Sequence, residues 1–266
     1  MRAKKFFVCS DPHVLMVGGK VGGIDTLTNN AVVKFIEDEG PWDGYVNAGD
    51  HFDMNVVSDH NKGKLKLVEG QRLFDDYRAG NAVLQQHYIA AGSPGKFYLL
   101  EGNHEDRVRR YIDAKPELEG IVNVEKFLPD FVTYIKYWSK HEILKLGRLN
   151  IIHGVGTASG QCRKALTDYG RNTLMGHSHR REVVAMRYHG DDETKIAESI
   201  PVLCEYRQPY LNNRPTAWSQ GFVVLYLWPD GRFNHFVVSV FDHGFISPSG
   251  KYYNGRKMRP ETRIVL

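Results

Sequence analysis

The 266-residue sequence has few features of a disulfide-rich or membrane-spanning protein. Its 3 cysteines, Cys9, Cys162 and Cys204, are odd in number and lack the spacing of a thiolate metal site. We therefore expect free, buried thiols in a reducing compartment. The longest run of aliphatic and aromatic residues, 222–228, is too short to cross a bilayer. Neither a disulfide framework nor a transmembrane helix is predicted.

The sequence also lacks a strong excess of charge of either sign. The formal net charge of +4 is compatible with an anionic substrate but is too small to predict nucleic-acid binding. Aromatic residues make up 12% of the chain and are not concentrated into a base-stacking platform. The apolar share of 42% and the charged share of 25% are those of an ordinary globular protein. We find no internal repeat, low-complexity tract or linker, and predict one domain spanning residues 1–266.

What the sequence does contain is a recurring arrangement of five polar segments, each preceded by a short apolar run. The apolar runs, which are typical of buried strands, are residues 5–9, 45–48, 97–100, 149–152 and 173–175. In open α/β sheets, ligands bind at the carboxyl ends of such strands, so we expect the polar segments to converge. The segments are Asp11-Pro12-His13, Gly49-Asp50-His51-Phe52-Asp53, Gly102-Asn103-His104-Glu105-Asp106, His153-Gly154 and Gly176-His177-Ser178-His179.

Between the apolar runs the pattern becomes helical. Asp25 is a good N-cap for a helix that Gly40-Pro41 ends. Residues 105–146 mix short helical patterns, and residues 158–169 predict another helix. A helix is also predicted over residues 64–91, with an inward stripe of Leu73, Tyr77, Leu84 and Tyr88.

The segment after Gly176 has the pattern of β-structure. Strands are predicted at residues 183–188, 200–206, 221–228 and 233–240. Pro229-Asp230-Gly231 joins the last two as a hairpin turn. This C-terminal β-rich segment, residues 180–245, predicts a second and largely antiparallel sheet. We therefore predict an α/β protein in which two sheets form a sandwich with helices on its outer faces.

The residue types in the five segments suit a pair of transition-metal ions. Asp, Asn and His without thiolate favour Mn²⁺, Fe, Zn²⁺ or Ni²⁺ over Ca²⁺ or a dedicated Mg²⁺ site. The carboxylate of Asp50 can give one oxygen to each of two ions. Asp11 and His13 lie two residues apart, so on an extended loop both can reach one ion. Such a pair of ions activates water and neutralises a phosphoryl group, which predicts a hydrolase of phosphate esters.

The ordered set Asp-x-His, Gly-Asp-x-x-Asp, Gly-Asn-His-Glu, His-Gly and Gly-His-Ser-His, spanning residues 11–179, resembles the calcineurin-like metallophosphoesterase superfamily. The second segment resembles the Gly-Asp-x-Phe-Asp of the superfamily's DNA exonucleases more than the corresponding motif of its protein phosphatases, and phage-encoded repair-exonuclease-like members are similar too. The resemblance implies a four-layer αββα sandwich of two mixed β-sheets flanked by helices. It departs from the usual pattern at Glu105, where Asp is commoner, and at Ser178, where Thr is commoner; neither removes a ligand.

The resemblance also implies roles for particular residues. Asp50 would bridge two divalent cations, Mn²⁺ being favoured, and a hydroxide between them would attack phosphorus. His104 would be catalytic with Asp50, protonating the leaving group or stabilising phosphoryl charge. The implied ligands are Asp11, His13, Asp50 and His179 for the first cation, and Asp50, Asn103, His153 and His177 for the second.

Substrate contacts are predicted for Asn103, His104, Arg107 and Arg180. For the two arginines, guanidinium clamps on phosphate compete with simple solvated charge. Alternatives stay open for three further residues. Asp53 would orient a ligand imidazole or contact substrate, His51 would contact substrate or be solvated, and Trp218 would pack between the sheets or line a groove.

Three functions are compatible with these residues. The leading hypothesis is a metal-dependent phosphodiesterase or nuclease acting on DNA, RNA or nucleotides. The alternative is a phosphomonoesterase acting on phosphoprotein or small metabolites, because the ligands do not determine the leaving group. A non-catalytic scaffold is the third, and retention of every ligand argues against it. Removal of a signal peptide of roughly 15–30 residues would take away Asp11 and His13, so we expect a cytoplasmic protein without membrane association.

Overall fold

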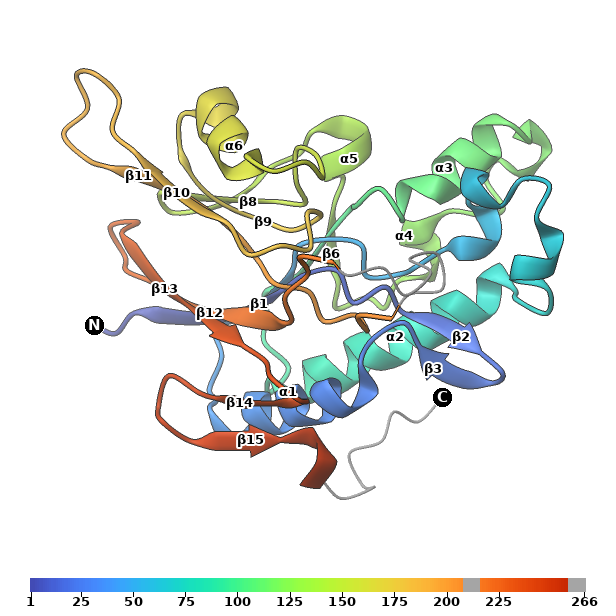
Figure 1. Ribbon diagram of the computed structural model, residues 1–266, viewed down its shortest axis with the longest axis horizontal. Helices are drawn as coiled ribbons and strands as arrows, with labels where there is room; N and C mark the ends of the chain where they lie inside the picture. The colour runs from blue at the N-terminus through green and yellow to red at the C-terminus, as the bar shows by residue number, and fades with distance from the viewer. Residues whose placement is uncertain (208–215, 258–266) are drawn as a thin grey trace.

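The computed structural model describes residues 1–207 and 216–257 of the chain. Two main β-sheets lie face to face, and helices cover the outer side of each (Figure 1). No helix within the described residues has the length and apolar character needed to cross a bilayer. The three cysteines are free and buried, as predicted.

The first sheet has six strands in the order β13-β12-β1-β4-β5-β6. Strands β1, β4, β5 and β6 are parallel, whereas β12 pairs antiparallel with β1 and β13 with β12. The strands are β1 (Lys4–Cys9), β4 (Gly44–Asn47), β5 (Phe97–Leu100), β6 (Thr133–Ile135), β12 (Gly221–Leu227) and β13 (Phe233–Ser239). The first three of the predicted strands are therefore neighbours in one sheet.

The second sheet has five strands in the order β10-β11-β9-β8-β7. Strands β8, β9 and β11 are parallel, and the two edge strands are antiparallel to their neighbours. The strands are β7 (Leu144–Leu146), β8 (Leu149–Ile152), β9 (Asn172–Met175), β10 (Val183–Met186) and β11 (Lys195–Ser199). The fourth and fifth predicted strands are its centre.

Alternate residues of β1 belong to two different cores. Phe6 and Val8 face the second sheet, whereas Phe7 and Cys9 face the helices on the other side. Burying each large apolar side chain contributes roughly 1.5–3 kcal/mol to the free energy of folding. Packing on both faces therefore fixes the position of β1. The core between the sheets includes Phe6, Val8, Val46, Leu100, Leu149, Ile151, Leu174, Ile200, Val223 and Leu225.

Helices α1 (Thr26–Asp38) and α2 (Leu73–Ala90) cover the outer face of the first sheet, and α5 (Tyr137–Lys140) and α6 (Gln161–Tyr169) pack on the second (Figure 1). Asp25 caps α1 as predicted, because its Oδ1 accepts a hydrogen bond of 3.0 Å from the Thr28 amide. The predicted fold class, two mixed sheets flanked by helices in four layers, is confirmed.

The remaining elements surround the sheet edges. A hairpin of β2 and β3 follows β1, and a second two-stranded sheet, β14 and β15, lies near α1 (Figure 1). These elements are β2 (Leu15–Val17), β3 (Lys20–Gly22), α3 (Asp106–Asp113), α4 (Val124–Phe127), β14 (Gly244–Ile246), β15 (Tyr252–Asn254) and the 3₁₀ turns η1 (Asn55–Val57), η2 (Asp59–Asn61), η3 (Leu65–Val68), η4 (Pro116–Leu118) and η6 (Gly255–Lys257).

Three predictions about elements are wrong. The second helix begins at Leu73 rather than 64, because the left-handed Gly70 separates it from η3. A strand lies at Lys195–Ser199, and residues 200–206 instead form isolated bridges. The C-terminal strands do not make a sheet of their own: β12 and β13 extend the first sheet, and β10 and β11 extend the second. The single-domain prediction includes residues 208–215 and 258–266, which lie outside the described residues, and it stays a prediction.

Candidate metal centre

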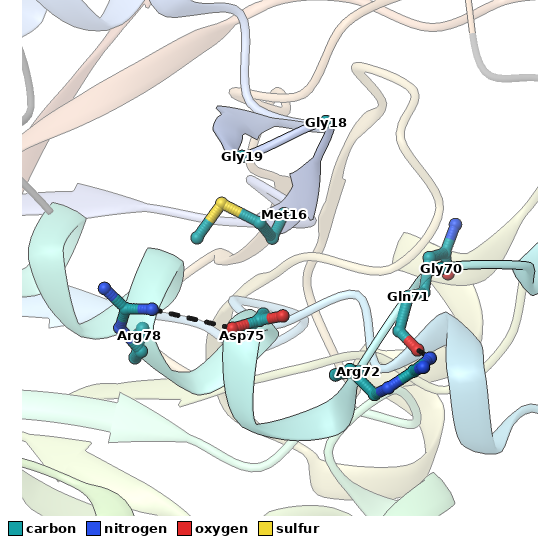
Figure 2. Close-up of a pocket in the computed structure, with 8 residues that line it drawn as sticks. All are labelled: Met16, Gly18, Gly19, Gly70, Gln71, Arg72, Asp75 and Arg78. Carbon is teal, nitrogen blue, oxygen red and sulfur yellow. Dashed lines mark hydrogen bonds and ion pairs between the residues drawn. The ribbon is translucent and has the colours of Figure 1, made fainter.

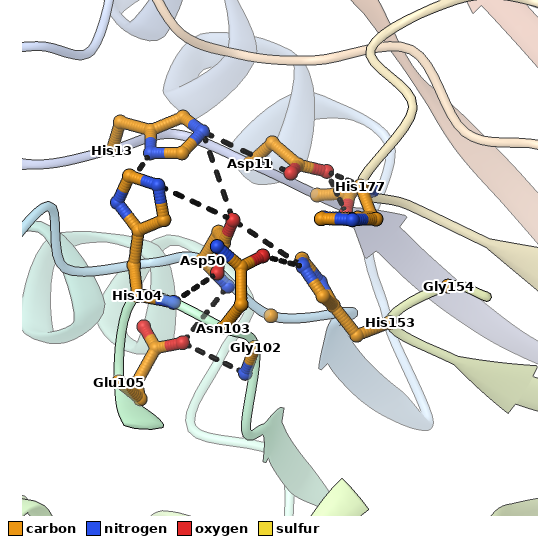
Figure 3. Close-up of polar contacts among 12 residues, drawn as sticks. Asp11, His13, Asp50, Gly102, Asn103, His104, Glu105, His153, Gly154 and His177 are labelled. Atoms are coloured by element: carbon orange, nitrogen blue, oxygen red, sulfur yellow. Dashed lines mark hydrogen bonds and ion pairs between the residues drawn. The ribbon is translucent and has the colours of Figure 1, made fainter. Parts of the chain in front are cut away.

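The five polar segments converge at the carboxyl ends of their strands (Figure 3). The site lies where the first and second sheets meet, because β1, β4 and β5 belong to one and β8 and β9 to the other. Its acidic side chains are buried: Asp11 is 0% exposed and Asp50 is 1% exposed. The residues brought together are Asp11, His13, Asp50, Asn103, His104, His153, His177 and His179.

Five of these residues have left-handed backbone conformations that side chains other than glycine rarely adopt. The φ angles are 52° for Asp11, 50° for His13, 51° for Asp50, 66° for His177 and 59° for His179. The loops hold each other in this state, since the His13 amide donates to the Asp50 carbonyl at 3.0 Å. Such strain persists only where surrounding structure imposes it, and it clusters at functional sites.

The first group of donor atoms comprises Asp11 Oδ1, His13 Nε2, Asp50 Oδ2 and His179 Nε2. His179 Nε2 lies 3.0 Å from Asp11 Oδ1 and 3.1 Å from His13 Nε2. His13 Nε2 lies 4.0 Å from Asp50 Oδ2. Donor atoms from all four residues lie within 4.8 Å of one another. Two carboxylates and two imidazoles at this spacing are a suitable ligand set for one divalent cation.

The second group shares Asp50 with the first. Asp50 Oδ2 lies 3.3 Å from His153 Nε2, and that nitrogen lies 3.2 Å from Asn103 Oδ1. His177 offers a further nitrogen within 4.8 Å of donor atoms of Asp50 and His153. Because one oxygen of Asp50 borders both groups, the aspartate is placed between two potential cation positions (Figure 3).

The hydrogen bonds of His153 orient its ring for ligation. Its Nδ1 lies 2.9 Å from the carbonyl oxygen of Ala48, which can only accept, so Nδ1 carries the proton. The Nε2 atom therefore faces Asp50 and Asn103. A metal-binding imidazole characteristically has its other nitrogen fixed by such a partner.

The electrostatics of the centre also suit a cation. Burial alone would raise the pKa of Asp50, but the His104 and His153 imidazoles hold that pKa well below its usual value. Burial would lower the pKa of His153, whereas Asp50 and Asp11 raise it to about 9. Positive charge is thus held beside these carboxylates by a proton on the imidazole. A divalent cation would displace that proton and take over its charge-balancing role, so the residues fit a metal centre.

Glu105 connects the second and third polar segments from behind the centre. Its carboxylate accepts from the amides of Asp50 at 3.0 Å, Phe52 at 2.9 Å and Gly102 at 2.8 Å. Gly102 is required beside it, because a Cβ there would collide with the Asp50 carboxylate. The departure from Asp at position 105 therefore places a longer carboxylate where it reaches three backbone donors.

His51 is neither solvated nor available to a substrate, and both sequence hypotheses for it are wrong. The side chain is 1% exposed. Its Nδ1 accepts from the Asn47 amide group at 2.9 Å, and its Nε2 donates to the Gly80 carbonyl at 2.9 Å. The imidazole therefore joins the second polar segment to α2. Burial lowers the pKa of His51 to about 4, so the ring is neutral.

Asp53 presents two acceptor oxygens to the imidazole of His104. His104 Nδ1 lies 2.9 Å from the Asp53 carbonyl and 3.0 Å from its Oδ1. Arg107 donates to the same carbonyl at 2.7 Å, and its other guanidinium nitrogen lies 2.8 Å from His104 Nε2. Of the two hypotheses for Asp53, orientation of an imidazole is therefore the one the contacts favour. Burial would raise the pKa of Asp53, but His104 and His13 lower it below its usual value.

A pocket opens beside the second group of donors. Arg107 lines this pocket, whereas Arg180 does not. Within the described part of the chain, the Arg180 guanidinium has no hydrogen bond or ion pair. The substrate-binding roles of both arginines stay predictions. The pocket is lined by Ser58, Asp59, His60, Asn103, Arg107, Arg110, Trp138 and His177.

Two tryptophans flank the centre. The Trp138 ring lies 5.1 Å from the His177 ring and 5.6 Å from the His153 ring, measured between centroids. The sequence did not indicate Trp138, because no polar segment or periodic pattern surrounds it. The Trp218 ring lies 4.4 Å from the His179 ring. Of the two alternatives for Trp218, this position beside the centre favours the lining of a groove over packing between the sheets.

A second hollow lies between the β2–β3 hairpin and the start of α2 (Figure 2). An ion pair of 3.6 Å joins Asp75 Oδ1 to Arg78 Nη1 along its wall. None of its lining residues is a histidine or cysteine, so it offers no counterpart to the donor groups described above. The lining residues are Met16, Gly18, Gly19, Gly70, Gln71, Arg72, Asp75 and Arg78.

No protein-family model and no curated protein matches this sequence. Solved structures with a similar fold include a metallophosphoesterase from Sphaerobacter thermophilus, with 12% identity, a TM-score of 0.43 and coverage of 89% of this chain and 88% of that one. A dimetal phosphatase from Danio rerio has 10% identity, a TM-score of 0.43 and coverage of 96% and 97%. The nuclease MPE from Pseudomonas putida has 12% identity, a TM-score of 0.36 and coverage of 82% and 84%.

Proposed function

We propose that this chain is a metal-dependent phosphoric ester hydrolase with two divalent cations, Mn²⁺ being favoured. The observation that carries the proposal is the position of Asp50, whose Oδ2 borders both buried groups of donor atoms. The first cation would be held by Asp11, His13, Asp50 and His179. The second would be held by Asp50, Asn103, His153 and His177.

When bound, the two cations would supply an activated water and neutralise charge on a phosphoryl group. Residues of the chain would orient the substrate and supply the proton for the leaving group. Asp53 holds the Nδ1 proton of His104, which directs Nε2 toward Asp50 Oδ2 at 3.8 Å. In its doubly protonated form, with a proton on each ring nitrogen, His104 would pass the Nε2 proton to the leaving oxygen, the role of a general acid. The Arg107 guanidinium, which lies 2.8 Å from Nε2 and donates to it when that nitrogen is unprotonated, would instead bind a phosphoryl oxygen of the substrate.

Phosphodiesters of nucleotides or nucleic acid are the proposed substrates. Two features support this choice over monoesters. The second polar segment resembles that of exonucleases, and the pocket beside the centre carries two arginines and a tryptophan, which suit a substrate with more than one phosphate or a base. A phosphomonoesterase is the competing hypothesis, because the same donor groups would serve it.

A substrate panel with the Mn²⁺-loaded protein tests the proposal. The panel contains bis(p-nitrophenyl) phosphate, p-nitrophenyl phosphate, single-stranded DNA and RNA. We expect the diester and at least one nucleic acid to be hydrolysed faster than the monoester. Efficient cleavage of the monoester without hydrolysis of any diester would indicate the competing phosphomonoesterase. Absence of any turnover would contradict the proposal.

A further inference from the structure

The pocket beside the second donor group has an inner end and an outer end. Asn103 and His177 form the inner end, at the candidate metal centre. We call the other lining residues the outer pocket: Ser58, Asp59, His60, Arg107, Arg110 and Trp138. These six residues come from η2 and the residue before it, from α3 and from α5, segments far apart in the sequence.

Trp138 is held rigidly by its two neighbours. The Tyr137 hydroxyl donates to the Gly154 carbonyl at 2.7 Å, in the segment that carries His153. The Ser139 amide and hydroxyl both donate to the Glu101 carboxylate, at 2.7 and 2.6 Å, at the end of β5. The backbone on both sides of the half-buried indole is therefore anchored to the loops that carry the donor atoms, and the ring itself lies 5.1 Å from the His177 ring. A fixed aromatic ring is a better platform for another ring than a mobile one, because less conformational entropy is lost on binding.

The outer pocket also contains two arginines at different depths. The Arg107 side chain is 12% exposed and lies against His104. The Arg110 side chain is 43% exposed, and its Nε lies 3.1 Å from Asp106 Oδ2. Arg107 is thus close to where a phosphoryl group would react, and Arg110 is farther out. A hydroxyl, a carboxylate and an imidazole, from Ser58, Asp59 and His60, complete the lining.

A rigid aromatic face, two guanidiniums and several hydrogen-bonding groups next to a phosphoryl site are the groups that recognise a nucleotide. Every nucleobase has a π-face that stacks on an aromatic side chain, and arginine binds phosphate. We infer that the outer pocket is a nucleobase subsite in which Trp138 stacks the base of a nucleotide whose phosphate lies at the centre. The inference rests on the proposed function and specifies its substrate class.

Equilibrium binding to the Mn²⁺-loaded protein tests this subsite. The probes are the phosphonate analogues of AMP, ribose 5-phosphate and phenyl phosphate, whose P–C bonds resist hydrolysis. The AMP analogue should bind roughly 5- to 100-fold more tightly than the ribose 5-phosphate analogue, the range that base–aromatic stacking provides. In Trp138→Leu this ratio should fall to near unity, while Trp138→Phe should keep part of it. Trp228→Leu is the matched control, since Trp228 is 40% exposed and is not a lining residue of the pocket.

Equal affinity for the analogues of AMP and ribose 5-phosphate would overturn the subsite. So would a Trp138→Leu variant that weakens both ligands by the same factor, which would indicate a purely structural role. A phenyl phosphonate that binds as tightly as the AMP analogue would also overturn it, because the pocket would then recognise any aryl ester. The proposed function is tested separately by turnover: base-dependent binding without hydrolysis of any ester would retain the subsite and reject the hydrolase. If Trp138→Leu does not fold, Trp138→Phe and the wild-type ratio decide.

Discussion

Asp50 Oδ2 lies 3.3 Å from His153 Nε2, although Asp50 follows a strand of the first sheet and His153 follows a strand of the second. The centre therefore forms only when the two sheets are packed together. The buried core between the sheets, which includes Val8 and Ile151, supplies that packing. Cation binding and folding should accordingly be coupled, because the unfolded chain has no preformed centre.

Mn²⁺ should stabilise the protein against thermal unfolding. A ligand at 100 times its Kd, binding only the folded state, adds about 2.7 kcal/mol, so the midpoint should rise by several degrees as Mn²⁺ is added. Asp50→Asn should abolish most of this rise, since it removes charge from both donor groups. Asp242→Asn, an exposed change away from the centre, is the control and should keep it. Differential scanning calorimetry with and without Mn²⁺ measures both; an unchanged midpoint in the wild type would count against coupling.

Replacement of His104 should separate catalysis from metal binding. His104→Ala should lower kcat about 10²–10⁴-fold, the range for a general acid, because the proton donor beside Asp50 is lost. Its Mn²⁺ content should remain near that of the wild type. His189→Ala, on the exposed loop between β10 and β11, should change neither. Steady-state kinetics and elemental analysis give the two readouts, and an undiminished kcat would remove His104 from the mechanism.

Glu105 should be important for stability independently of any cation. Glu105→Ala leaves three amide donors without their acceptor, and unsatisfied buried groups cost roughly 1–3 kcal/mol each. Glu105→Gln keeps an acceptor oxygen and should lose less. Urea denaturation of the apo-protein measures the free energy of unfolding. The exposed Glu119→Ala should have little effect, and a Glu105→Ala variant as stable as that control would contradict the assigned role.

His87 should make the free energy of unfolding depend on pH. Its Nε2 donates to Asn29 Oδ1 at 2.7 Å, and its Nδ1 accepts from the Tyr45 hydroxyl at 2.8 Å. Burial, chiefly, lowers the pKa of His87 to about 3. Since the unfolded imidazole titrates near 6.5, the unfolded state binds the proton first. The contribution of His87 is complete above pH 6.5 and falls as pH drops toward 3.

Between pH 7 and pH 4 this one residue should account for a loss of roughly 3 kcal/mol in the free energy of unfolding. His87→Gln can retain both hydrogen bonds but cannot titrate, so its denaturation midpoint should depend less on pH than that of the wild type. His189→Gln serves as the exposed control. Parallel pH dependence in wild type and His87→Gln, followed by urea denaturation at several pH values, would show that His87 titrates normally.

The sequence was most informative about features that depend on neighbouring residues. An apolar run ending in Asp, Asn or His predicted the strand ends that meet at the centre, because chain order and strand burial are local properties. Asp25 was recognisable for the same reason, since N-caps depend on neighbouring amides. The family resemblance implied that Asp50 lies between two donor groups. The structure adds the distances, which are 4.0 Å from Asp50 Oδ2 to His13 Nε2 and 3.3 Å to His153 Nε2.

Features created by distant segments could not be predicted. Trp138 lies outside the five polar segments and becomes part of a pocket only when α5 is anchored to the ends of β5 and β8. Trp218 reaches His179 from a loop near β12. Strand β11 was misplaced because Lys195 and Glu198 interrupt its apolar pattern, whereas its pairing with β9 and β10 places it in the sheet. In each case tertiary pairing outweighed local pattern.

The central claim is that one carboxylate connects two cations, and anomalous diffraction from a crystal grown with Mn²⁺ tests it most directly. We predict two anomalous peaks about 3.5–4 Å apart, each within coordination distance of Asp50. One peak should also be coordinated by His13 and the other by His153. A single peak, or two peaks of which neither contacts Asp50, would contradict it.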